Sequence, residues 1–321
     1  MLRCFRLASM GLGGTYPNPL VGCVIVHNDE IIGEGFHQRA GEAHAEAVAI
    51  ESVKDKDLLR ESTLYVNLEP CAHLGKTPPC SDLIIEHGIP RLVICNTDPF
   101  HAVNGKGIEQ LTTAGIAVTT GLLEEEGTRL NRRFFTVQKK QRPYIILKWA
   151  QTADGNMDKE RAPHEQGSFV ISGEPAQWLM HRWRSEEHAI MVGTRTAVVD
   201  NPRLNVRHVS GRDPIRFVVD RENELPDSLH LFQGDEPAIR LLSVDAAGWV
   251  QEMHAMGIHS IMVEGGAATL KSFIDADLWD EARIIQSAQW IGHGLRAPQL
   301  NSWPNNQTSV GNDTIFTHYR E

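Results

Sequence analysis

Two cysteines, a histidine and a glutamate in the first part of the chain are the side chains that a catalytic zinc site needs. His44 is followed two positions later by Glu46, and Cys71 precedes Cys80 by nine positions. One imidazole and two thiolates leave the fourth tetrahedral position of zinc to water, as in catalytic rather than structural sites. Zinc lowers the pKa of its water towards about 7, and a carboxylate that is not a ligand can move the released proton. We therefore predict zinc held by His44, Cys71 and Cys80, with Glu46 as the catalytic proton carrier of a hydrolytic nucleobase-type deaminase.

The elements predicted around these residues place them at strand and helix ends. His44 starts a helical run, Cys71 follows the strand Leu64–Leu68, and Cys80 opens the next helix, whose amino end favours a thiolate. His-x-Glu followed by Pro-Cys-x-x-Cys is the signature of zinc deaminases. The chain matches its first two parts, but the second cysteine comes nine positions after the first instead of three.

The remaining cysteines and two nearby histidines carry weaker signals. Cys4, Cys23 and Cys95 lie in apolar runs, so we expect them in the core. His73 and His101 could contact substrate or be solvated, and the pattern leaves both open.

Alternation of strand-like and helix-like runs predicts an α/β protein of two domains, residues 1–141 and 142–321, divided at a polar linker, Gln138–Pro143. In the first domain the strands are Val21–Val26, Leu64–Leu68, Leu92–Cys95 and Ala117–Thr119, and the helices are His44–Glu51, Cys80–His87, Gly107–Ala114 and Glu124–Arg133. In the second the strands are Tyr144–Lys148, Ala189–Val192, Ile215–Val219, Ile239–Leu242, Ser260–Val263 and Glu281–Ile285, with helices at Glu174–Arg184 and Ala267–Ile274.

Length and composition indicate an ordinary globular enzyme. The 321 residues can bury two cores, and 41% are apolar. A formal charge of −10 argues against nucleic acid as a partner, although local arginines could hold a small anionic substrate. No run approaches the roughly 20 apolar residues of a membrane span, and five cysteines without a secretion signal fit a reducing compartment, so we expect a cytoplasmic protein without membrane contact. Homo-oligomerisation stays open.

Longer motifs add a family resemblance. The run from Glu69 to Cys80, with Pro17–Gly22 before it and Val103–Gly107 after it, resembles the bifunctional riboflavin-biosynthesis deaminase–reductase family, often called RibD. In that family the long cysteine spacing replaces the short one. The resemblance continues through Leu147–Ala150, Ala153–Gly155, Arg184, Val192–Gly193, Asp200–Arg207 and Val263–Gly266. It implies a cytidine-deaminase-like three-layer α/β/α domain followed by a dihydrofolate-reductase-like α/β domain, both acting on phosphoribosylaminopyrimidines.

A second site is predicted where the strand ending at Val263 meets the helix that follows it. Free amides at the helix start, beside Gly265 and Gly266, can receive a phosphate, though alone this pattern is weak. The resemblance strengthens it and implies NADPH contacts from Ala150, Val170, Thr196, Asp200, Gly266, Ala267, Ala268, Thr269, Leu270, Lys271 and Ser272. It implies substrate contacts from Ser168, Arg184, Leu204, Arg207 and Glu264.

Arg184 and Arg207 suit the phosphate of such a substrate, because a guanidinium binds phosphate oxygens with a fixed fork of donors. Two departures from the family stand near the cofactor residues. Val170 occupies a position where the family often has tryptophan, and the stretch Met157–Gly167 is longer and more polar than expected.

The resemblance implies two successive reactions. Zinc-dependent deamination of 2,5-diamino-6-(5-phosphoribosylamino)pyrimidin-4(3H)-one comes first, and NADPH-dependent reduction of the product's ribosyl group to ribityl follows. One alternative is a zinc deaminase of another nucleobase with a non-reductase second domain. Another is a zinc-stabilised interaction protein, which needs a fourth protein ligand that the sequence does not place beside the three.

Overall fold

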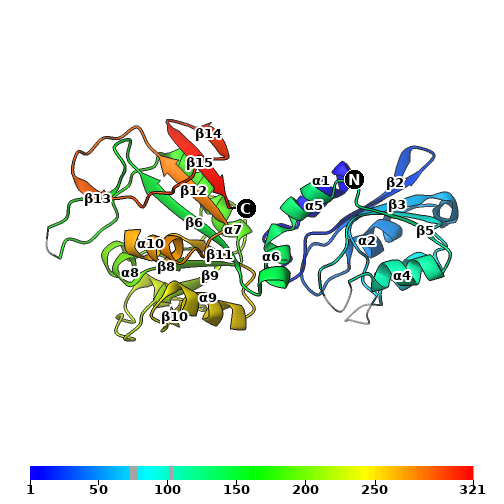
Figure 1. The fold of residues 1–321 in the computed structure, drawn as a ribbon, viewed down its shortest axis with the longest axis horizontal. Coiled ribbons are helices and arrows are strands. Elements are labelled where there is room, and N and C mark those ends of the chain that lie inside the picture. Colours follow the sequence, from blue (N-terminus) through cyan, green and yellow to red (C-terminus); the bar gives the residue numbers. More distant parts are fainter. Residues whose placement is uncertain (73–77, 101–103, 163, 321) are drawn as a thin grey trace. The chain divides into compact units, whose positions relative to one another are not determined.

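The computed structural model describes residues 1–72, 78–100, 104–162 and 164–320, and it divides into two compact units, Met1–Gln141 and Arg142–Glu321. Each unit is a layered α/β structure (Figure 1). The α/β class expected from the sequence is therefore confirmed. No helix within the described ranges is long and apolar enough to cross a membrane.

The first unit is built on a five-stranded sheet within its described residues, in the order β2-β1-β3-β4-β5. Strands β3, β4 and β5 are parallel, and β1 pairs antiparallel with both β2 and β3. The strands are β1 (Gly22–His27), β2 (Glu30–Phe36), β3 (Thr63–Leu68), β4 (Arg91–Asn96) and β5 (Ala117–Thr120). The helices are α1 (Leu2–Ser9), α2 (Ala45–Ser52), η1 (Lys56–Glu61), α3 (Cys80–Glu86), α4 (Lys106–Thr113), α5 (Glu124–Leu130) and α6 (Arg132–Lys140).

Alternating side chains of this sheet enter two separate cores. Cys23 and Ile25 of β1 pack with α2, α3 and α4, whereas Val24 packs with Cys4 and Leu7 of α1 on the other face. Because successive strand residues point to opposite faces, this alternation requires helices on both sides. The unit is thus the three-layer α/β/α sandwich that was expected.

Strand β2 was not predicted, because its glycines resemble turn residues. A Cβ atom on Gly35 would lie 2.4 Å from the Ala45 carbonyl oxygen and 2.5 Å from the Ala49 nitrogen. The glycine therefore lets the backbone of α2 rest directly on β2. This close packing positions the amino end of α2.

The predicted helix Glu124–Arg133 is two helices, and the predicted linker is partly helical. Asn131, which is buried between α5 and α6, accepts a hydrogen bond from the Leu20 N–H at 2.8 Å and donates one to the Leu20 carbonyl at 2.9 Å. These two hydrogen bonds to the distant Leu20 backbone hold Asn131 in place and explain why the helix is interrupted there. Helix α6 then continues to Lys140, inside the stretch predicted as a linker, and Gln141 ends it in the left-handed conformation (φ 52°).

The second unit is built on an eight-stranded sheet within its described residues, in the order β10-β9-β8-β11-β6-β12-β15-β14. All neighbours from β10 to β12 are parallel, while β15 and β14 are antiparallel additions at one edge. The strands are β6 (Tyr144–Gln151), β8 (Ala189–Val192), β9 (Ile215–Val219), β10 (Ile239–Leu241), β11 (Ser260–Val263), β12 (Glu281–Gln286), β14 (Asn306–Val310) and β15 (Asp313–Tyr319); β7 (Asn156–Lys159) pairs separately with β13 (Gly294–Arg296).

Helices cover both faces of this sheet. They are α7 (Glu174–Glu186), α8 (Thr194–Asp200), η2 (His230–Phe232), α9 (Ala246–Ala255) and α10 (Ala267–Asp275). Ile145 and Leu147 of β6 pack with α9 and α10, whereas Tyr144 and Ile146 enter a second core that includes Ala197 of α8. Because β8, β11, β6 and β12 run in parallel, the segments that follow them gather at one edge of the sheet.

Candidate active sites

In the first unit, α2 brings His44 and Glu46 to one place. His44 is the residue before the helix, with extended backbone (φ −75°, ψ 162°), and Glu46 lies in the first turn. Glu46 is 3% exposed. A carboxylate buried this deeply is costly unless it has a partner or a role.

Cys71 and Cys80 meet His44 from two other elements, the segment after β3 and the first residue of α3. The His44 Nδ1 atom lies 3.5 Å from Cys71 Sγ and 3.3 Å from Cys80 Sγ. The three ligand atoms all lie within 4.8 Å of one another. A tetrahedral zinc ion bonded at about 2.0–2.3 Å separates its ligand atoms by roughly 3.6 Å, so the residues fit the metal. Within the described residues this is the one such cluster of histidine, cysteine and acidic side chains.

The two thiols of this cluster differ in acidity. A hydrogen bond from the Cys80 side chain, with others from His44 and the Cys80 backbone N–H, lowers the pKa of Cys71 to about 4. The same interaction with Cys71, together with burial, raises the pKa of Cys80 well above its usual value. Burial raises the pKa of Glu46 to about 7, and the Cys71 charge adds to this effect. The surroundings thus favour the ionised form of Cys71, and burial favours the protonated form of Glu46.

Glu69 was not predicted as a site residue, yet it organises the wall next to Cys71. Its carboxylate is buried and accepts backbone N–H bonds from Asp98 and Gly105 at one oxygen and from Gly107 and Ile108 at the other, at 2.9–3.2 Å. These bonds fix the described flanks of the loop between β4 and α4. The sequence offered one signal for this role, because an acidic residue stands directly before Pro70-Cys71. It did not show which backbone N–H groups that residue binds.

His37 was also missed, and it connects three segments of the site. Its Nδ1 lies 3.1 Å from the Ala43 carbonyl, and its Nε2 lies 3.0 Å from the Asn18 side-chain amide. Because a carbonyl only accepts, Nδ1 carries the proton and Nε2 accepts from Asn18. The His37 ring also packs edge-on to the ring of His44, at 5.4 Å between centroids. His73 and His101, which the sequence left open, lie outside the described residues.

Gly35→Ala should disturb this site without touching a ligand. The added methyl group meets the α2 backbone at 2.4 Å, so α2 must shift and displace His44. We expect unfolding of the first unit to become easier by about 1–3 kcal/mol and zinc retention to fall. Thermal unfolding and metal content after dialysis measure both effects. Ile31→Ala, at an exposed position of the same strand, is the control; a Gly35 variant that melts and retains zinc like this control would contradict the prediction.

In the second unit, the predicted phosphate seat is the turn between β11 and α10, at the carboxyl edge of the sheet. The Gly266 N–H donates to the Thr196 hydroxyl at 2.9 Å, which joins the start of α10 to α8. A Cβ atom on Gly265 would lie 2.5 Å from the Gly193 nitrogen, so the turn is tightly packed against the segment after β8. Glycines at a helix start are suited to a pyrophosphate, and the Gly266 N–H is engaged by Thr196 in this structure. Two predicted cofactor residues, Thr196 and Gly266, are thus brought together.

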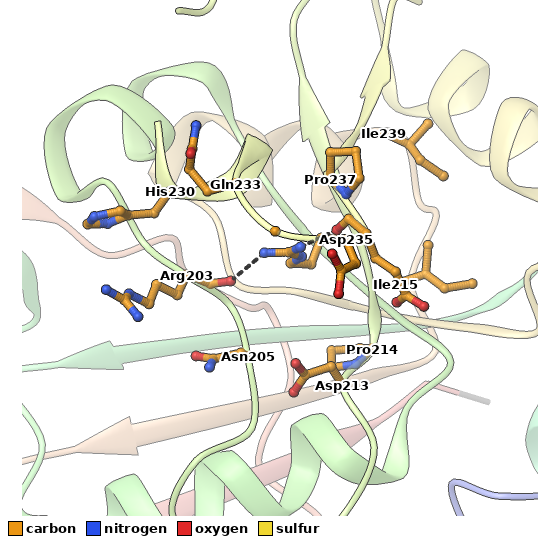
Figure 2. A pocket seen from close by; sticks show the side chains of 13 residues that line it. Arg203, Asn205, Asp213, Pro214, Ile215, His230, Gln233, Asp235, Pro237 and Ile239 are labelled. Carbon is orange, nitrogen blue, oxygen red and sulfur yellow. Dashed lines mark hydrogen bonds between the residues drawn. The ribbon is translucent and has the colours of Figure 1, made fainter. Parts of the chain in front are cut away.

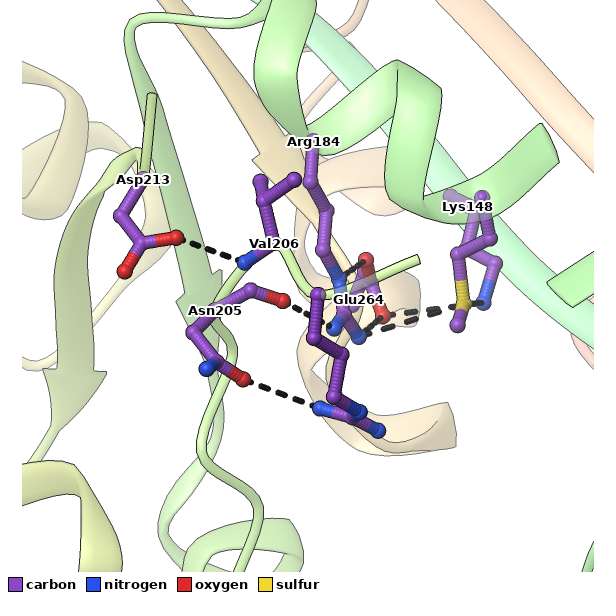
Figure 3. A network of polar contacts seen from close by, with 8 residues as sticks. Lys148, Arg184, Asn205, Val206, Asp213 and Glu264 are labelled. Atoms are coloured by element: carbon purple, nitrogen blue, oxygen red, sulfur yellow. Dashed lines mark hydrogen bonds and ion pairs between the residues drawn. The ribbon is translucent and has the colours of Figure 1, made fainter. Parts of the chain in front are cut away.

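Figure 3 shows that Arg184 and Glu264 form a buried ion pair. Arg184 Nε and Nη2 each donate to a Glu264 carboxylate oxygen at 2.8 Å, and Nη1 donates to the Asn205 carbonyl at 3.1 Å. Lys148, which the sequence did not single out, lies 3.6 Å from the same carboxylate. Two of the donor groups predicted to bind phosphate are thus paired with Glu264 in this structure, and the predicted substrate contact of Arg184 stays a prediction. Both side chains of the pair are 7% exposed.

Charge partners control the ionisation of Glu264. Burial by itself raises the pKa of this carboxyl, but the charges of Arg184 and Lys148 and the Arg184 hydrogen bonds outweigh burial and lower the pKa to about 2. Burial likewise lowers the pKa of Lys148. The carboxylate is therefore ionised at neutral pH, in a site with two cations.

The other predicted residues of this unit lie on loops, near the end of β6, and in α8 and α10. Arg207 is exposed, and its Nη1 donates to the Asn205 side chain at 2.9 Å. Asp200 ends α8 and lies 3.8 Å from Arg161, which belongs to the long polar stretch Met157–Gly167. Ser168 and Val170 are exposed, Leu204 is buried, Ala150 is near the end of β6, and Ala267 to Ser272 lie in α10.

A pocket of about 760 Å³ opens elsewhere in this unit, at the amino ends of β9 and β10 (Figure 2). Arg203, Asn205, Asp213 and His230 are among its polar lining residues. None of the residues predicted to bind cofactor or substrate lines it. Asn205 and Asp213 belong both to the lining of this pocket and to the polar network around Arg184 (Figure 3).

Comparisons with known proteins agree on both units. The model of the RibD C-terminal domain matches residues 143–312, and that of the cytidine and deoxycytidylate deaminase zinc-binding region matches residues 1–96. The riboflavin biosynthesis protein RibD of Aquifex aeolicus is 36% identical over 94% of this chain and 89% of its own length. The Escherichia coli protein of the same name is 33% identical, over 92% and 87%.

Solved structures show the same similarity across both units. A structure of Acinetobacter baumannii RibD has a TM-score of 0.90 at 30% identity and covers 98% of this chain and 96% of its own. A Thermotoga maritima structure, described as a diaminohydroxyphosphoribosylaminopyrimidine deaminase and 5-amino-6-(5-phosphoribosylamino)uracil reductase, has a TM-score of 0.87 at 35% identity, covering 99% and 96%.

Proposed function

This chain belongs to the RibD family of riboflavin biosynthesis proteins, and on that premise we propose that it catalyses two successive steps of the pathway. The first unit deaminates 2,5-diamino-6-(5-phosphoribosylamino)pyrimidin-4(3H)-one. The second reduces the ribosyl group of the resulting 5-amino-6-(5-phosphoribosylamino)uracil to ribityl, with NADPH. The observation that carries the proposal is the convergence of His44, Cys71 and Cys80 beside the buried Glu46. A non-reductase second domain is not favoured, because the RibD model covers residues 143–312.

Deamination replaces the ring's amino group by oxygen from water, so a proton must travel from water to the departing nitrogen. His44, Cys71 and Cys80 would hold the zinc, which supplies Lewis acidity and lowers the pKa of water when bound. Glu46 is suited to the proton transfer because it lies in the first turn beyond His44 and is buried next to Cys80. Its carboxylate takes a proton from water and delivers it to the nitrogen, and ammonia leaves.

In the second unit, we assign cofactor contacts to Ala150, Val170, Thr196, Asp200 and the segment from Gly266 to Ser272. NADPH supplies hydride when bound, and the chain orients the reacting carbon and balances charge. We assign substrate contacts to Ser168, Arg184, Leu204, Arg207 and Glu264. Arg184 supports this site through Glu264, whose carboxylate it orients with two hydrogen bonds. Arg207, exposed beside this network, binds the substrate phosphate.

Arg207→Ala should weaken the substrate of the second step without affecting NADPH. Loss of charged hydrogen bonds to phosphate costs about 1.5–3 kcal/mol, so we expect KM for the aminouracil phosphate to rise roughly 10- to 100-fold. KM for NADPH should change less than about twofold. Arg203→Ala, at an exposed position of the same loop, is the matched control. An equal loss of affinity for both compounds would indicate a folding defect and count against the phosphate role.

Two assays test the proposed function as a whole. Metal analysis should find about one zinc per chain, and the purified chain should oxidise NADPH when given the aminouracil phosphate. Ammonia release from the diaminopyrimidine tests the first step separately. Zinc without either activity would support an interaction protein instead.

We further propose a cytoplasmic enzyme with small-molecule partners and no nucleic-acid or membrane partner. All five cysteines are free thiols in the structure, which suits a reducing compartment. The net charge of −10 supports the absence of nucleic acid. Sedimentation of the purified protein decides whether it forms a homo-oligomer.

A further inference from the structure

Helix α7 covers the face of the sheet on which Lys148 stands. Alternate residues of β6 point to the same face, and Ile146 and Ala150, on either side of Lys148 in this alternation, pack in clusters that Trp183 of α7 also contacts. Lys148 therefore points from β6 towards α7. Its side chain is 9% exposed, so the ammonium group depends on nearby protein atoms for its hydrogen bonds.

The thioether of Met180 accepts one of these hydrogen bonds. Lys148 Nζ donates to Met180 Sδ at 2.9 Å, and Arg184 Nη2 approaches the same sulfur at 3.9 Å. Met180 and Arg184 are one turn apart in α7, so they lie on the same side of the helix. The two cations that neighbour Glu264 therefore also meet at a neutral sulfur atom.

The distance between Lys148 and Glu264 makes this sulfur contact significant. Lys148 Nζ lies 3.6 Å from the Glu264 carboxylate (Figure 3), beyond normal hydrogen-bond length, whereas both Arg184 bonds to that carboxylate measure 2.8 Å. Met180 Sδ is thus the nearer of these two acceptors to the ammonium group. Without the sulfur, Nζ would move onto the carboxylate or lose its proton, and either change would alter the charge that Glu264 presents to a substrate.

Opposing effects determine whether Lys148 keeps its proton. Burial lowers the pKa of Lys148, the charge of Glu264 raises it, and the charge of Arg184 lowers it again. A sulfur atom is polarizable and accepts a hydrogen bond more strongly from an ammonium group than from a neutral amine. The Met180 contact therefore adds to the effects that keep Lys148 protonated.

Two further ionisable side chains stand on the elements that pack against Lys148. Arg283 is directly opposite it on β12 and forms ion pairs with Glu281 and Glu187. His181 of α7 is buried, and this burial lowers its pKa to about 4. A guanidinium keeps its charge up to a pKa above about 12. Neither Arg283 nor His181 therefore changes charge in the alkaline range in which a lysine titrates.

We propose that Met180 is a positioning residue of the reductase site around Glu264, whose thioether holds the Lys148 ammonium group beside the carboxylate and keeps it charged. Leucine has nearly the same volume as methionine but no acceptor, whereas glutamine has a similar length and carries an oxygen acceptor. The property required at position 180 is thus a hydrogen-bond acceptor and not apolar volume alone. This inference rests on the proposed reductase function and adds a residue that acts through Lys148.

The direct test follows the ionisation of Lys148 by NMR on the full zinc-loaded chain, with isotopic labels at the lysine Cε atoms. Lys148→Arg identifies the signal, because the Lys148 resonance disappears. Met180→Leu should lower the titration midpoint of Lys148 by about one pH unit, since a charge-assisted hydrogen bond to the protonated form is lost. Met180→Gln should return the midpoint to within about half a unit of the wild-type value.

Reduction of the aminouracil phosphate gives the second readout. The alkaline limb of kcat/KM against pH should move to lower pH by about one unit in Met180→Leu and recover in Met180→Gln. The Kd for NADPH, measured by calorimetry, should stay within about twofold in both variants. Met256→Leu, at the exposed carboxyl end of α9, is the matched control and should leave the limb in place. A packing role for Met180 predicts the reverse order, with leucine tolerated and glutamine harmful.

The outcomes separate this inference from the proposed function. If the wild-type chain does not reduce the aminouracil phosphate, the reductase proposal fails and the inference fails with it. If the wild type is active but Met180→Leu leaves the Lys148 midpoint unchanged, the reductase proposal stands and the role of Met180 is wrong. A lowered midpoint with an unmoved alkaline limb would also overturn the role, because the charge of Lys148 would then not matter for reduction. Greater damage by glutamine than by leucine would assign Met180 to packing.

Discussion

Glu46→Gln is expected to reduce ammonia release at least 100-fold while zinc stays bound. Glutamine has nearly the same shape but cannot accept and return a proton, and positioned acid–base groups contribute about 10²–10⁴-fold to rates. The ligands His44, Cys71 and Cys80 are untouched, so metal content should not change. The assay is ammonia release from the diaminopyrimidine, with zinc measured in the same sample.

The second activity provides the internal control for this variant. Reduction of separately supplied aminouracil phosphate should continue at the wild-type rate, because Glu46 belongs to the first unit. Undiminished deamination would remove Glu46 from the mechanism. Loss of zinc together with deamination would show instead that the buried carboxylate supports the metal site.

Glu264→Gln is expected to have the largest effect on the stability of the second unit. The substitution leaves Arg184 and Lys148 as buried cations without their carboxylate, and removing one partner of a buried pair costs about 3–5 kcal/mol. The same change should abolish measurable reduction, since it removes the charge assigned to the substrate site. Urea unfolding of the second unit and NADPH oxidation follow the two effects.

The pH dependence of stability identifies the ion pair as the cause. The pKa of Glu264 is about 2 in the folded chain, below its ordinary value of 4.5. A depressed carboxyl pKa contributes stability that is present above the unfolded value and is lost as the pH falls towards the folded value. The stability difference between wild type and Glu264→Gln should therefore shrink as the pH falls from about 4.5 to 2. A difference that stays constant across this range would contradict the assignment.

A second buried ion pair of the same unit supplies a matched control. Asp280 accepts two hydrogen bonds from Arg142, one of them at 2.7 Å, at the amino end of the sheet. Asp280→Asn should also lower the unfolding free energy, but KM for both reductase substrates should stay unchanged. If it impairs reduction as strongly as Glu264→Gln, general destabilisation rather than the site explains both variants.

Local sequence patterns were sufficient to identify the cluster of three candidate zinc ligands and most of the elements around it. The ability to bind zinc depends on residue type, which the sequence shows directly. His44, Cys71 and Cys80 stand at the ends of strands and helices that the sequence also predicts, and these ends meet in the fold. Apolar periodicity similarly predicted β6, β8, β9, β10, β11 and β12, which the structure joins in parallel. These features depend on neighbours a few positions apart, which the sequence displays directly. The assignments of substrate and cofactor contacts came from the resemblance and stay predictions.

The tertiary structure decided which charged and polar groups are already engaged. A buried arginine and an exposed one look alike in sequence, so only the fold shows that Arg184 pairs with Glu264, 80 positions away, while Arg207 remains exposed. The four amide bonds to Glu69 and the hydrogen bond from Lys148 to Met180 are also long-range. Such contacts depend on how distant strands are ordered in a sheet. Composition and periodicity do not determine the order of the strands in a sheet. That order is set by how the strands and helices pack in the folded chain.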